Sequence, residues 1–324
     1  MKITPDRLRL AVQAFFTLLS LYAGYRFLLF LNWAGGRSDT FVPKPGAVEG
    51  FLPISALLGL RRLVSSGFWD RAHPAALTIF LAALAMAFLF RKGFCGYICP
   101  VGFLSGLLER VGRRLGLAKT LPRWLDRPLH AIKYLVMGGF LVGVFSMSQR
   151  ALEYFLRSPF NQTSDAHMLG FFLHPSGTAL AVLLILAALS LVVRNFWCRY
   201  LCPYGALLGI MSWFSPVRVT RDADACVHCG RCSANCPSGI AVEMKNAVRT
   251  PECIGCGQCV GACPVEGCLG FRALGKRIPW WTVAVGAVLL LLAARIWAGY
   301  AGVWDTPLPP DMLKRIYQAG AGLS

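Results

Sequence analysis

The stretch FCGYICPVGFLSGL, from Phe94 to Leu107, stands where an apolar segment runs into a basic one. A second stretch, WCRYLCPYGALLGI, repeats it in the same setting from Trp197 to Ile210. Each contains two cysteines four residues apart, followed by a proline and then a glycine. On a helix, residues four apart share one face, so the two thiols of each pair are expected on one side. The repetition predicts two similar segments that form a pseudo-two-fold pair.

The composition is that of a membrane protein. Of the 324 residues, 56% are hydrophobic, whereas soluble domains contain about 45–50%. The excess lies in blocks long enough to cross a bilayer core of about 30 Å. The net charge of +18 would suit a nucleic-acid binder, but the basic residues flank the apolar blocks, as expected for cytoplasmic loops. We therefore expect a multi-pass protein of the cytoplasmic membrane, surrounded by lipid and without a nucleic-acid partner.

Five segments are predicted to span the membrane, roughly 10–33, 75–90, 131–147, 178–193 and 280–300. The second and fourth are short and run directly into the quoted stretches, so their helices are expected to continue into the cysteines. Loops 91–128 and 194–279 carry a net positive charge, and loop 149–176 carries none. The positive-inside rule then places the N-terminus and both basic loops inside, and the C-terminal tail outside.

The strongest chemical pattern lies between residues 226 and 264. CVHCGRCSANCP begins at Cys226 and CIGCGQCVGACP begins at Cys253, and both have the C-x2-C-x2-C-x3-C-P spacing of bacterial ferredoxins. In two-cluster ferredoxins the fourth cysteine of each run ligates the other cluster. The spacing thus predicts one [4Fe–4S] cluster on Cys226, Cys229, Cys232 and Cys263, and a second on Cys253, Cys256, Cys259 and Cys236. A structural zinc site would need only four ligands, arranged as two pairs.

A third candidate site is formed by the cysteines of the repeated stretches, Cys95, Cys99, Cys198 and Cys202. If the two segments pair, four thiolates meet at the inner membrane face, which suffices for an additional iron–sulfur cluster or a single metal ion. Redox-active thiols and plain packing are the alternatives. A cysteine-free copy of the motif, FLPISALLGL from Phe51 to Leu60, is expected to form an interfacial or re-entrant helix that packs or caps a quinone pocket.

These residues together resemble those of the membrane polyferredoxins. That family includes NapH-type quinol dehydrogenases, NosR-type regulators and CcoG-type proteins linked to copper handling, and its members join two C-x3-C-P motifs on transmembrane helices to a cytoplasmic 2[4Fe–4S] domain. The resemblance covers roughly residues 75–270 and leaves the subfamily open. The loops leave no room for a NosR-type flavin domain, and the tail leaves none for a CcoG-type immunoglobulin-like domain. NapH-type proteins usually have four spans, and this sequence predicts five.

Several other residues are weaker candidates. Cys268 fits no motif and is expected to be a buried small hydrophobe. His228 lies inside the first ferredoxin loop, where it tunes or merely covers a cluster. Asp70, His73, Asp165 and His167 fall outside the membrane in this topology and could exchange protons with a quinone, although ordinary loop polarity is the alternative. The sequence has no C-x-x-C-H motif for covalent haem and shows no flavin attachment motif.

The predicted fold class is an α-helical integral membrane protein of about five transmembrane helices, with an inserted bacterial-ferredoxin-like α+β domain. Its expected segments are 1–74 with the first span, 75–218 with the two motifs, 219–275 with the clusters, and 276–324 with the last span and a short external tail. The resemblance implies electron transfer between a quinone pool and a redox protein partner, as in a quinol dehydrogenase. Low-potential clusters would instead favour a ferredoxin-fed quinone reductase. The alternative from another class is a metal (copper) reductase or assembly factor for a membrane enzyme.

Overall fold

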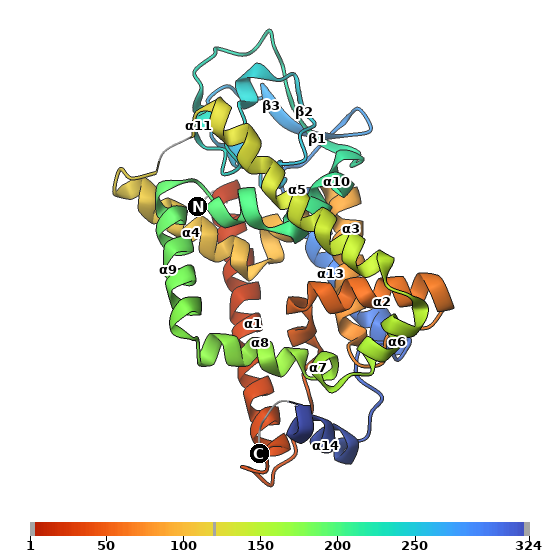
Figure 1. Ribbon diagram of the computed structural model, residues 1–324. Coiled ribbons are helices and arrows are strands. Elements are labelled where there is room, and N and C mark those ends of the chain that lie inside the picture. The colour runs from red at the N-terminus through yellow and green to blue at the C-terminus, as the bar shows by residue number, and fades with distance from the viewer. Residues whose placement is uncertain (1–3, 119–120, 321–324) are drawn as a thin grey trace. The chain divides into compact units, whose positions relative to one another are not determined.

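The computed structural model describes residues 4–118 and 121–320, and most of these are helical (Figure 1). The longer helices are α1 (Pro5–Ala34), α2 (Pro53–Ser66), α3 (Pro74–Phe90), α4 (Pro100–Arg114), α5 (Arg123–Ser146), α8 (Ser164–Leu173), α9 (Gly177–Val192), α10 (Pro203–Trp213), α13 (Thr282–Tyr300) and α14 (Pro310–Gly320). The shorter ones are α6 (Gln149–Leu156), α7 (Pro159–Gln162), α11 (Arg231–Ala234) and α12 (Gln258–Gly261). Helical turns of other types are η1 (Gly46–Phe51), η2 (Phe94–Ile98), η3 (Trp197–Leu201) and η4 (Val242–Met244). The strands are β1 (Val217–Arg221), β2 (Ala247–Val248), β3 (Leu269–Ala273) and β4 (Lys276–Ile278).

Among the described residues, three helices are long and apolar enough to cross a membrane: α1, α5 over Trp124–Ser146, and α13. A fourth span arises if α8 and α9, which meet at a bend of 75°, are counted as one. Helix α3 is also apolar but has 17 residues, fewer than the ~20 that a span usually needs. All five segments predicted as spans contain helix. The chain is therefore a helical membrane protein, and the count of five spans stays a prediction.

Helices α3 and α9 end before the cysteines, which corrects the expectation that they continue into the motifs. Arg91 takes a left-handed backbone with φ 60°, and Asn195 does the same with φ 49°. The Arg91 side chain holds its turn by donating to the carbonyl oxygens of Ser212 at 3.1 Å and Thr250 at 2.7 Å. A left-handed backbone is unfavourable for residues with a Cβ, so these tertiary hydrogen bonds override the helical tendency of the apolar run.

Both cysteine motifs then fold in the same way. A π-helical turn, η2 or η3, contains the first cysteine, and the second closes it through hydrogen bonds Cys99 N–Phe94 O at 2.9 Å and Cys202 N–Trp197 O at 3.0 Å. A proline then begins a new helix, where its missing N–H leaves no donor unpaired. The cysteine-free copy is similar, with the turn η1 followed by Pro53 at the start of α2. Isolated π turns frequently mark functional sites.

The described chain divides into two compact units. Unit 1 comprises Met1–Thr17, Ala83–Gly138 and Leu183–Leu290. Unit 2 comprises Leu18–Ala82, Gly139–Val182 and Leu291–Ser324. All thirteen cysteines belong to unit 1, and the cysteine-free copy of the motif belongs to unit 2.

A four-stranded antiparallel sheet supports the ferredoxin-like part of unit 1. Its strand order is β2-β1-β3-β4, and α11 is seen beside it (Figure 1). Val219 in β1 lies opposite Val248 in β2 and Phe271 in β3. These three side chains are almost fully buried, which gives the sheet one apolar face. The two cysteine runs lie in the connections between these strands.

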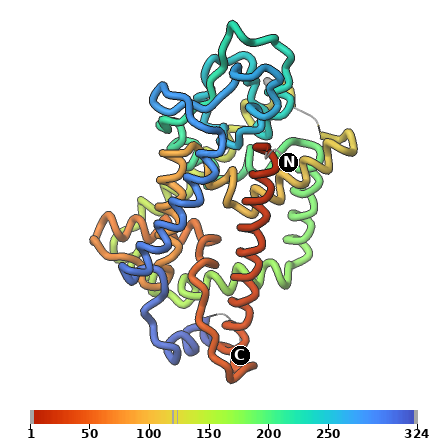
Figure 2. Tube along the Cα trace, turned by 180° about the vertical axis from the view of Figure 1, so that it is seen from behind, coloured from red at the N-terminus to blue at the C-terminus, as the bar shows by residue number. Residues whose placement is uncertain are grey.

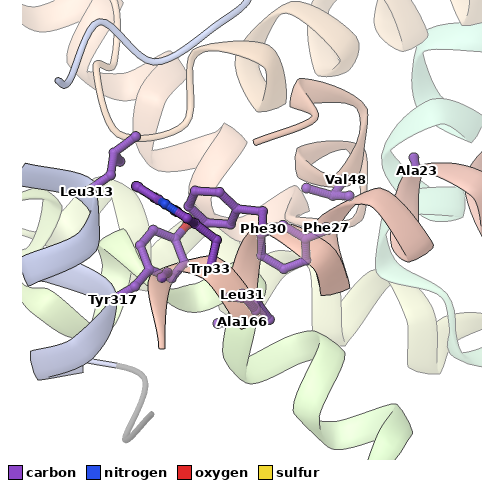
Figure 3. Close-up of a cluster of buried hydrophobic side chains, with 10 residues drawn as sticks. Ala23, Phe27, Phe30, Leu31, Trp33, Val48, Ala166, Leu313 and Tyr317 are labelled. Carbon is purple, nitrogen blue, oxygen red and sulfur yellow. The ribbon is translucent and has the colours of Figure 1, made fainter. Parts of the chain in front are cut away.

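The core of unit 2 is aromatic. Phe27, Phe30 and Trp33 of α1 are buried together with Leu313 and Tyr317 of α14 (Figure 3). The Phe30 and Tyr317 rings meet edge to face with centroids 5.0 Å apart, an arrangement that aromatic quadrupoles favour. This cluster fixes the C-terminal helix against the first one within the unit.

Helices α3 and α13 lie side by side (Figure 2). In unit 1, a Cβ added to Gly286 would lie 2.6 Å from the Phe90 ring. In unit 2, Ala75 and Ala298 are fully buried in a small cluster with Trp304. Small residues allow close approach of membrane helices, and they do so here along both parts of this pair.

Candidate iron–sulfur centres and paired-cysteine site

Five cysteines line a cavity of about 330 Å³ in unit 1, which we call cavity 1. Cys226, Cys229 and Cys232 come from the first ferredoxin run, and Cys263 comes from the second. These four are the set that the spacing assigns to one cluster. The fifth is Cys268, for which no such role was predicted.

The other four ferredoxin cysteines line a separate space of about 360 Å³, cavity 2. They are Cys253, Cys256 and Cys259 of the second run and Cys236 of the first. The rest of the wall is mainly apolar and includes Val219, Ile240, Val242, Val248 and Ile254. Such a wall limits the access of water to whatever the thiols bind.

The donor sets of both cavities suit [4Fe–4S] clusters. Cysteine thiolates are the usual ligands of such clusters, and each cavity combines three cysteines of one run with the fourth of the other. Within the described ranges, no three His, Cys, Asp or Glu side chains are grouped closely enough to hold a single metal ion. A cubane needs its ligands further apart than one ion does, because each cysteine binds a different iron.

The two loops repeat the same backbone conformation. Two and four residues after the first cysteine, φ is positive, at His228 (52°) and Gly230 (70°) in one loop and at Gly255 (67°) and Gly257 (72°) in the other. The His228 backbone N–H bonds to the sulfur of Cys226 and lowers the pKa of that thiol. His228 thus acts through its backbone, in a conformation that glycine adopts in the second loop.

The predicted paired-cysteine site consists of Cys95, Cys99, Cys198 and Cys202. Burial raises the pKa of the Cys198 thiol, and the charges of the other three cysteines raise it further, so the four lie in one region of unit 1. The two motif copies meet there. The Phe94 ring of η2 packs edge-on against the Tyr204 ring of α10, with centroids 5.7 Å apart. Helix α4 contacts both η2 and η3. The Cys202 sulfur accepts a hydrogen bond from the Gly205 N–H at 3.3 Å.

Buried positive charge surrounds this site. Lys92 and Lys133 are almost fully buried and share one carboxylate, Glu252, at 3.7 and 2.6 Å. Although burial opposes ionisation, the two lysines lower the pKa of Glu252 to about 2. Burial raises the pKa of the Cys95 thiol to about 12, although Lys92 pulls it down. Two lysines against one carboxylate leave a positive charge that favours thiolates, the form in which cysteine binds metals.

The loop of cavity 2 packs directly on the first motif. A Cβ added to Gly96 would lie 2.6 Å from the carbonyl oxygen of Ile254. The hydroxyl of Tyr97 donates a hydrogen bond to the carbonyl oxygen of Gly255 at 3.3 Å. Gly96 follows Cys95, and Ile254 follows Cys253, so two thiol-bearing segments are in direct contact.

Comparison with known proteins also separates the two cysteine-motif segments from the ferredoxin-like segment. A family described as a 4Fe-4S binding domain matches residues 72–118 and again 175–221, which contain the two copies of the cysteine motif. A 4Fe-4S dicluster domain matches residues 218–264. YccM of Escherichia coli, named as a putative electron transport protein, is 38% identical over 317 residues, or 95% of this chain and 89% of its own length. The chain belongs to the membrane polyferredoxin family.

Other polyferredoxin relatives match about half of the chain. The methylamine utilization ferredoxin-type protein MauN of Paracoccus denitrificans is 31% identical, over 54% of this chain and 59% of its own length. The ferredoxin-type protein NapH of Haemophilus influenzae is 28% identical, over 52% of this chain and 56% of its own. No solved structure matches the chain. The family and its relatives make this polyferredoxin an iron–sulfur protein of electron transfer.

Several polar residues of the polyferredoxin site were not predicted as site residues. Lys92 lies in the basic loop 91–128, and Lys133 lies in the predicted span 131–147. A lysine inside an apolar span is itself a functional signal, because burying its charge in a membrane is costly. Glu252 had no such signal, since its role depends on two lysines far away in the sequence. Cys268 is buried as expected, but its thiol also interacts with the neighbouring cysteines of cavity 1.

In unit 2 of the polyferredoxin, the residues considered for proton exchange have two different settings. Asp70, His73 and Asp165 are at most 3% exposed, whereas His167 is exposed and stacks on Phe160. Ordinary loop polarity therefore describes His167 and not the other three. The alternative that all four are ordinary polar loop residues is therefore wrong for Asp70, His73 and Asp165.

The three buried residues belong to an ionic network. Lys44 Nζ lies 2.9 Å from Glu49 and 2.7 Å from Asp165, and His73 Nδ1 lies 3.5 Å from Glu49. Tyr317 donates a hydrogen bond to Asp165 at 2.8 Å. Although burial opposes it, Lys44 lowers the pKa of Glu49, so that carboxylate stays ionised. The network ties the segment before η1 to α8 and α14.

Proposed function

We propose that this protein passes electrons between a quinone pool and a redox protein partner, in the manner of a quinol dehydrogenase. The observation that carries the proposal is the direct packing of the cavity 2 loop on the first cysteine motif through Gly96 and Ile254. It supports a continuous path of thiol-bound centres from the paired-cysteine site to the ferredoxin-like region. The alternation of cysteines between the two cavities supports one [4Fe–4S] cluster in each, with the ligand sets given above.

The proposed path runs from the paired-cysteine site to cavity 2 and then to cavity 1. Cys229 of cavity 1 is exposed, which suits the end of the path that meets a soluble partner. The buried lysines around the paired cysteines support a third thiolate-bound cluster or metal there, because their charge would offset that of thiolates, although burial keeps the free thiols protonated. The protein's own residues would supply ligands, positive charge and exclusion of water, and the clusters would supply one-electron chemistry.

We also propose five spans, with the N-terminus and the clusters on the cytoplasmic side and the C-terminus outside. The net positive charge of loops 91–128 and 194–279 supports this orientation. The proposed segments remain 1–74, 75–218, 219–275 and 276–324. Helix α3, which has 17 residues, decides whether both termini face the same side.

The test is reduction of the oxidised protein by quinol. The protein is purified anaerobically, mixed with a menaquinol analogue and followed by electron paramagnetic resonance. Rapid appearance of the reduced-cluster signal is the expected result. If dithionite reduces the clusters and the quinol does not, the quinol dehydrogenase proposal fails and a ferredoxin-fed quinone reductase takes its place.

A copper reductase or assembly factor is the second candidate. The presence of four half-buried thiols favours it, because soft thiolate ligands select Cu(I), although the thiols would have to move together, since no three of them are close enough to hold one ion in the described structure. In that case purified protein would carry copper at the paired cysteines, and the double variant Cys95→Ser, Cys198→Ser would lose it. Iron at this site, or no metal at all, would argue against the copper role.

A further inference from the structure

Arg221 is the last residue of β1 and lines cavity 1. Side chains alternate between the two faces of a strand, so Arg221 shares a face with Val219, which lines cavity 2. Leu269, which lies opposite Arg221 in β3, lines cavity 1 as well. The strand β1 therefore presents a valine to one cavity and an arginine to the other.

Two nitrogen atoms of the Arg221 side chain are shielded from water. Its Nε and Nη1 are buried and have no hydrogen-bond partner in the described structure, whereas Nη2 donates to the Asn246 side chain at 3.1 Å. A buried donor without an acceptor is costly. Both atoms therefore favour a group in cavity 1 that carries acceptors and negative charge.

The same guanidinium group acts on a predicted ligand of cavity 1. The backbone N–H of His228 and the neighbouring Arg221 side chain both lower the pKa of the Cys226 thiol. Both groups thus favour the thiolate, which is the form of cysteine that binds iron. Iron-bound thiolates are negative acceptors of the kind that the unpaired N–H groups of Arg221 lack.

Cavity 2 has no comparable side chain. Within the described residues, no charged side chain lines it. Arg9 lies near its wall, but its guanidinium group is already paired with the oxygens of Gly96 and Gln258, both at 3.2 Å. The two predicted clusters therefore meet different electrostatic surroundings.

The opposing charge in the wall of cavity 1 is Glu243. Its carboxylate lies 3.9 Å from the Cys232 sulfur, where it accepts the thiol hydrogen. An iron-bound thiolate has no such hydrogen, so the carboxylate would then repel the sulfur. Arg221 and Glu243 are thus expected to act on a cluster with opposite signs.

We propose that Arg221 raises the reduction potential of the [4Fe–4S] cluster in cavity 1 and so draws electrons toward the exposed end of the path. Reduction adds negative charge to a cluster, and cluster potentials depend on local charge and on hydrogen bonds to the sulfurs. An arginine stays protonated, so the one-electron step moves no proton at this residue. The inference rests on the proposed function, because it needs a cluster in cavity 1 at the end of that path.

The test is an anaerobic redox titration of the holoprotein in neutral detergent, with dithionite and mediators, followed by electron paramagnetic resonance. In Arg221→Leu, the midpoint of one cluster should fall. The ratio of reduced to oxidised cluster at a fixed potential should change at least tenfold, which corresponds to about 59 mV for one electron. The other cluster should keep its midpoint. A merely structural arginine would lower the melting temperature and leave both midpoints in place.

Three further variants complete the design. Glu243→Gln removes the opposing charge and should raise the same midpoint that Arg221→Leu lowers. Arg272→Leu is the matched control, because Arg272 is exposed in β3 next to the buried Phe271 and lines neither cavity. It should change the ratio by less than twofold for either cluster. If Arg221→Leu loses iron, Arg221→Gln, which removes the charge but keeps an amide donor, takes its place.

The assignment is overturned if neither midpoint falls in Arg221→Leu, or if both fall equally. It is also overturned if Glu243→Gln moves the midpoint of the other cluster. Reduction by quinol separates this inference from the function. Quinol-reducible clusters with unmoved midpoints in Arg221→Leu would keep the function and reject the role of the arginine. A fall of one midpoint in a protein that quinol does not reduce would keep that role and reject the quinol dehydrogenase.

Discussion

At the residue scale, cavity 1 contains one more thiol than a cubane requires. Cys263 is the predicted fourth ligand, because it ends the second run at the ferredoxin spacing. Cys268 lines the same cavity and interacts with both Cys226 and Cys263. Its sulfur also lies 3.6 Å from the carbonyl oxygen of Asp222, which gives its thiol hydrogen an acceptor. The Cys263 sulfur likewise lies 3.4 Å from the carbonyl oxygen of Val265, so hydrogen bonding does not separate the two thiols, and the ferredoxin spacing alone assigns the ligand role to Cys263.

We therefore expect Cys263→Ser and Cys268→Ser to differ. The first removes a ligand, so purified protein should lose one cluster, seen as a drop in iron and acid-labile sulfide and in the reduced-cluster resonance signal. The second should keep both clusters. The opposite pattern, with cluster loss only in Cys268→Ser, would move the ligand role to Cys268.

At the element scale, the contact between η2 and the cavity 2 loop depends on a glycine. A side chain at Gly96 would meet the backbone oxygen of Ile254, and a backbone oxygen cannot move aside as a flexible side chain can. Arg9 contacts the carbonyl of the same glycine, which adds a polar contact to a tight one. The π turn η2 is thus held in place by the backbone of Ile254 and the side chain of Arg9.

Gly96→Ala is expected to destabilise the protein by about 1–3 kcal/mol, the usual cost of overpacking a tight contact. Thermal unfolding in detergent, followed by loss of cluster absorbance, measures the change. Gly138→Ala, within α5, is the control, because an added methyl group meets nothing within 4 Å. It should be neutral or slightly stabilising, since alanine favours helix over glycine. Equal effects of the two substitutions would contradict the importance of the contact.

At the scale of the whole molecule, the number of spans decides the side of the C-terminus. Within residues 4–118 and 121–320, three long helices and one bent pair give an even count, and α3 as a further span makes the count odd. The positive-inside rule keeps the N-terminus in the cytoplasm in either case. Five spans therefore place the two termini on opposite sides.

A topology reporter fused after Ser324 is expected to report an external C-terminus. Alkaline phosphatase, which is active only outside the cytoplasm, gives the readout. The same reporter inserted after Gly116, in the first basic loop, should be inactive. A cytoplasmic reading at Ser324 with the same reading at Gly116 would reduce the count to four and remove α3 from the spans.

The sequence by itself determined the family and the membrane class, and it predicts how the ferredoxin cysteines are divided between two clusters. Those features follow from local cysteine spacing and from apolar runs, which can be read from the sequence without knowing any tertiary contact. Cys236 and Cys263 illustrate this, because a fixed run length predicts that they face the other run's cavity, and they line it.

Only the tertiary structure decided where α3 ends and which polar side chains pair around the cysteine sites. Arg91 ends α3 before the motif because its side chain finds oxygens more than a hundred residues away. Lys133 and Glu252 meet across 119 residues, and Arg9 and Gln258 meet across 249 residues. Such pairs leave no periodic or spacing signal, because even where one residue is unusual in its own neighbourhood, as Lys133 is, its distant partner cannot be read from the sequence. Their charges and hydrogen bonds matter only once the fold has buried them together.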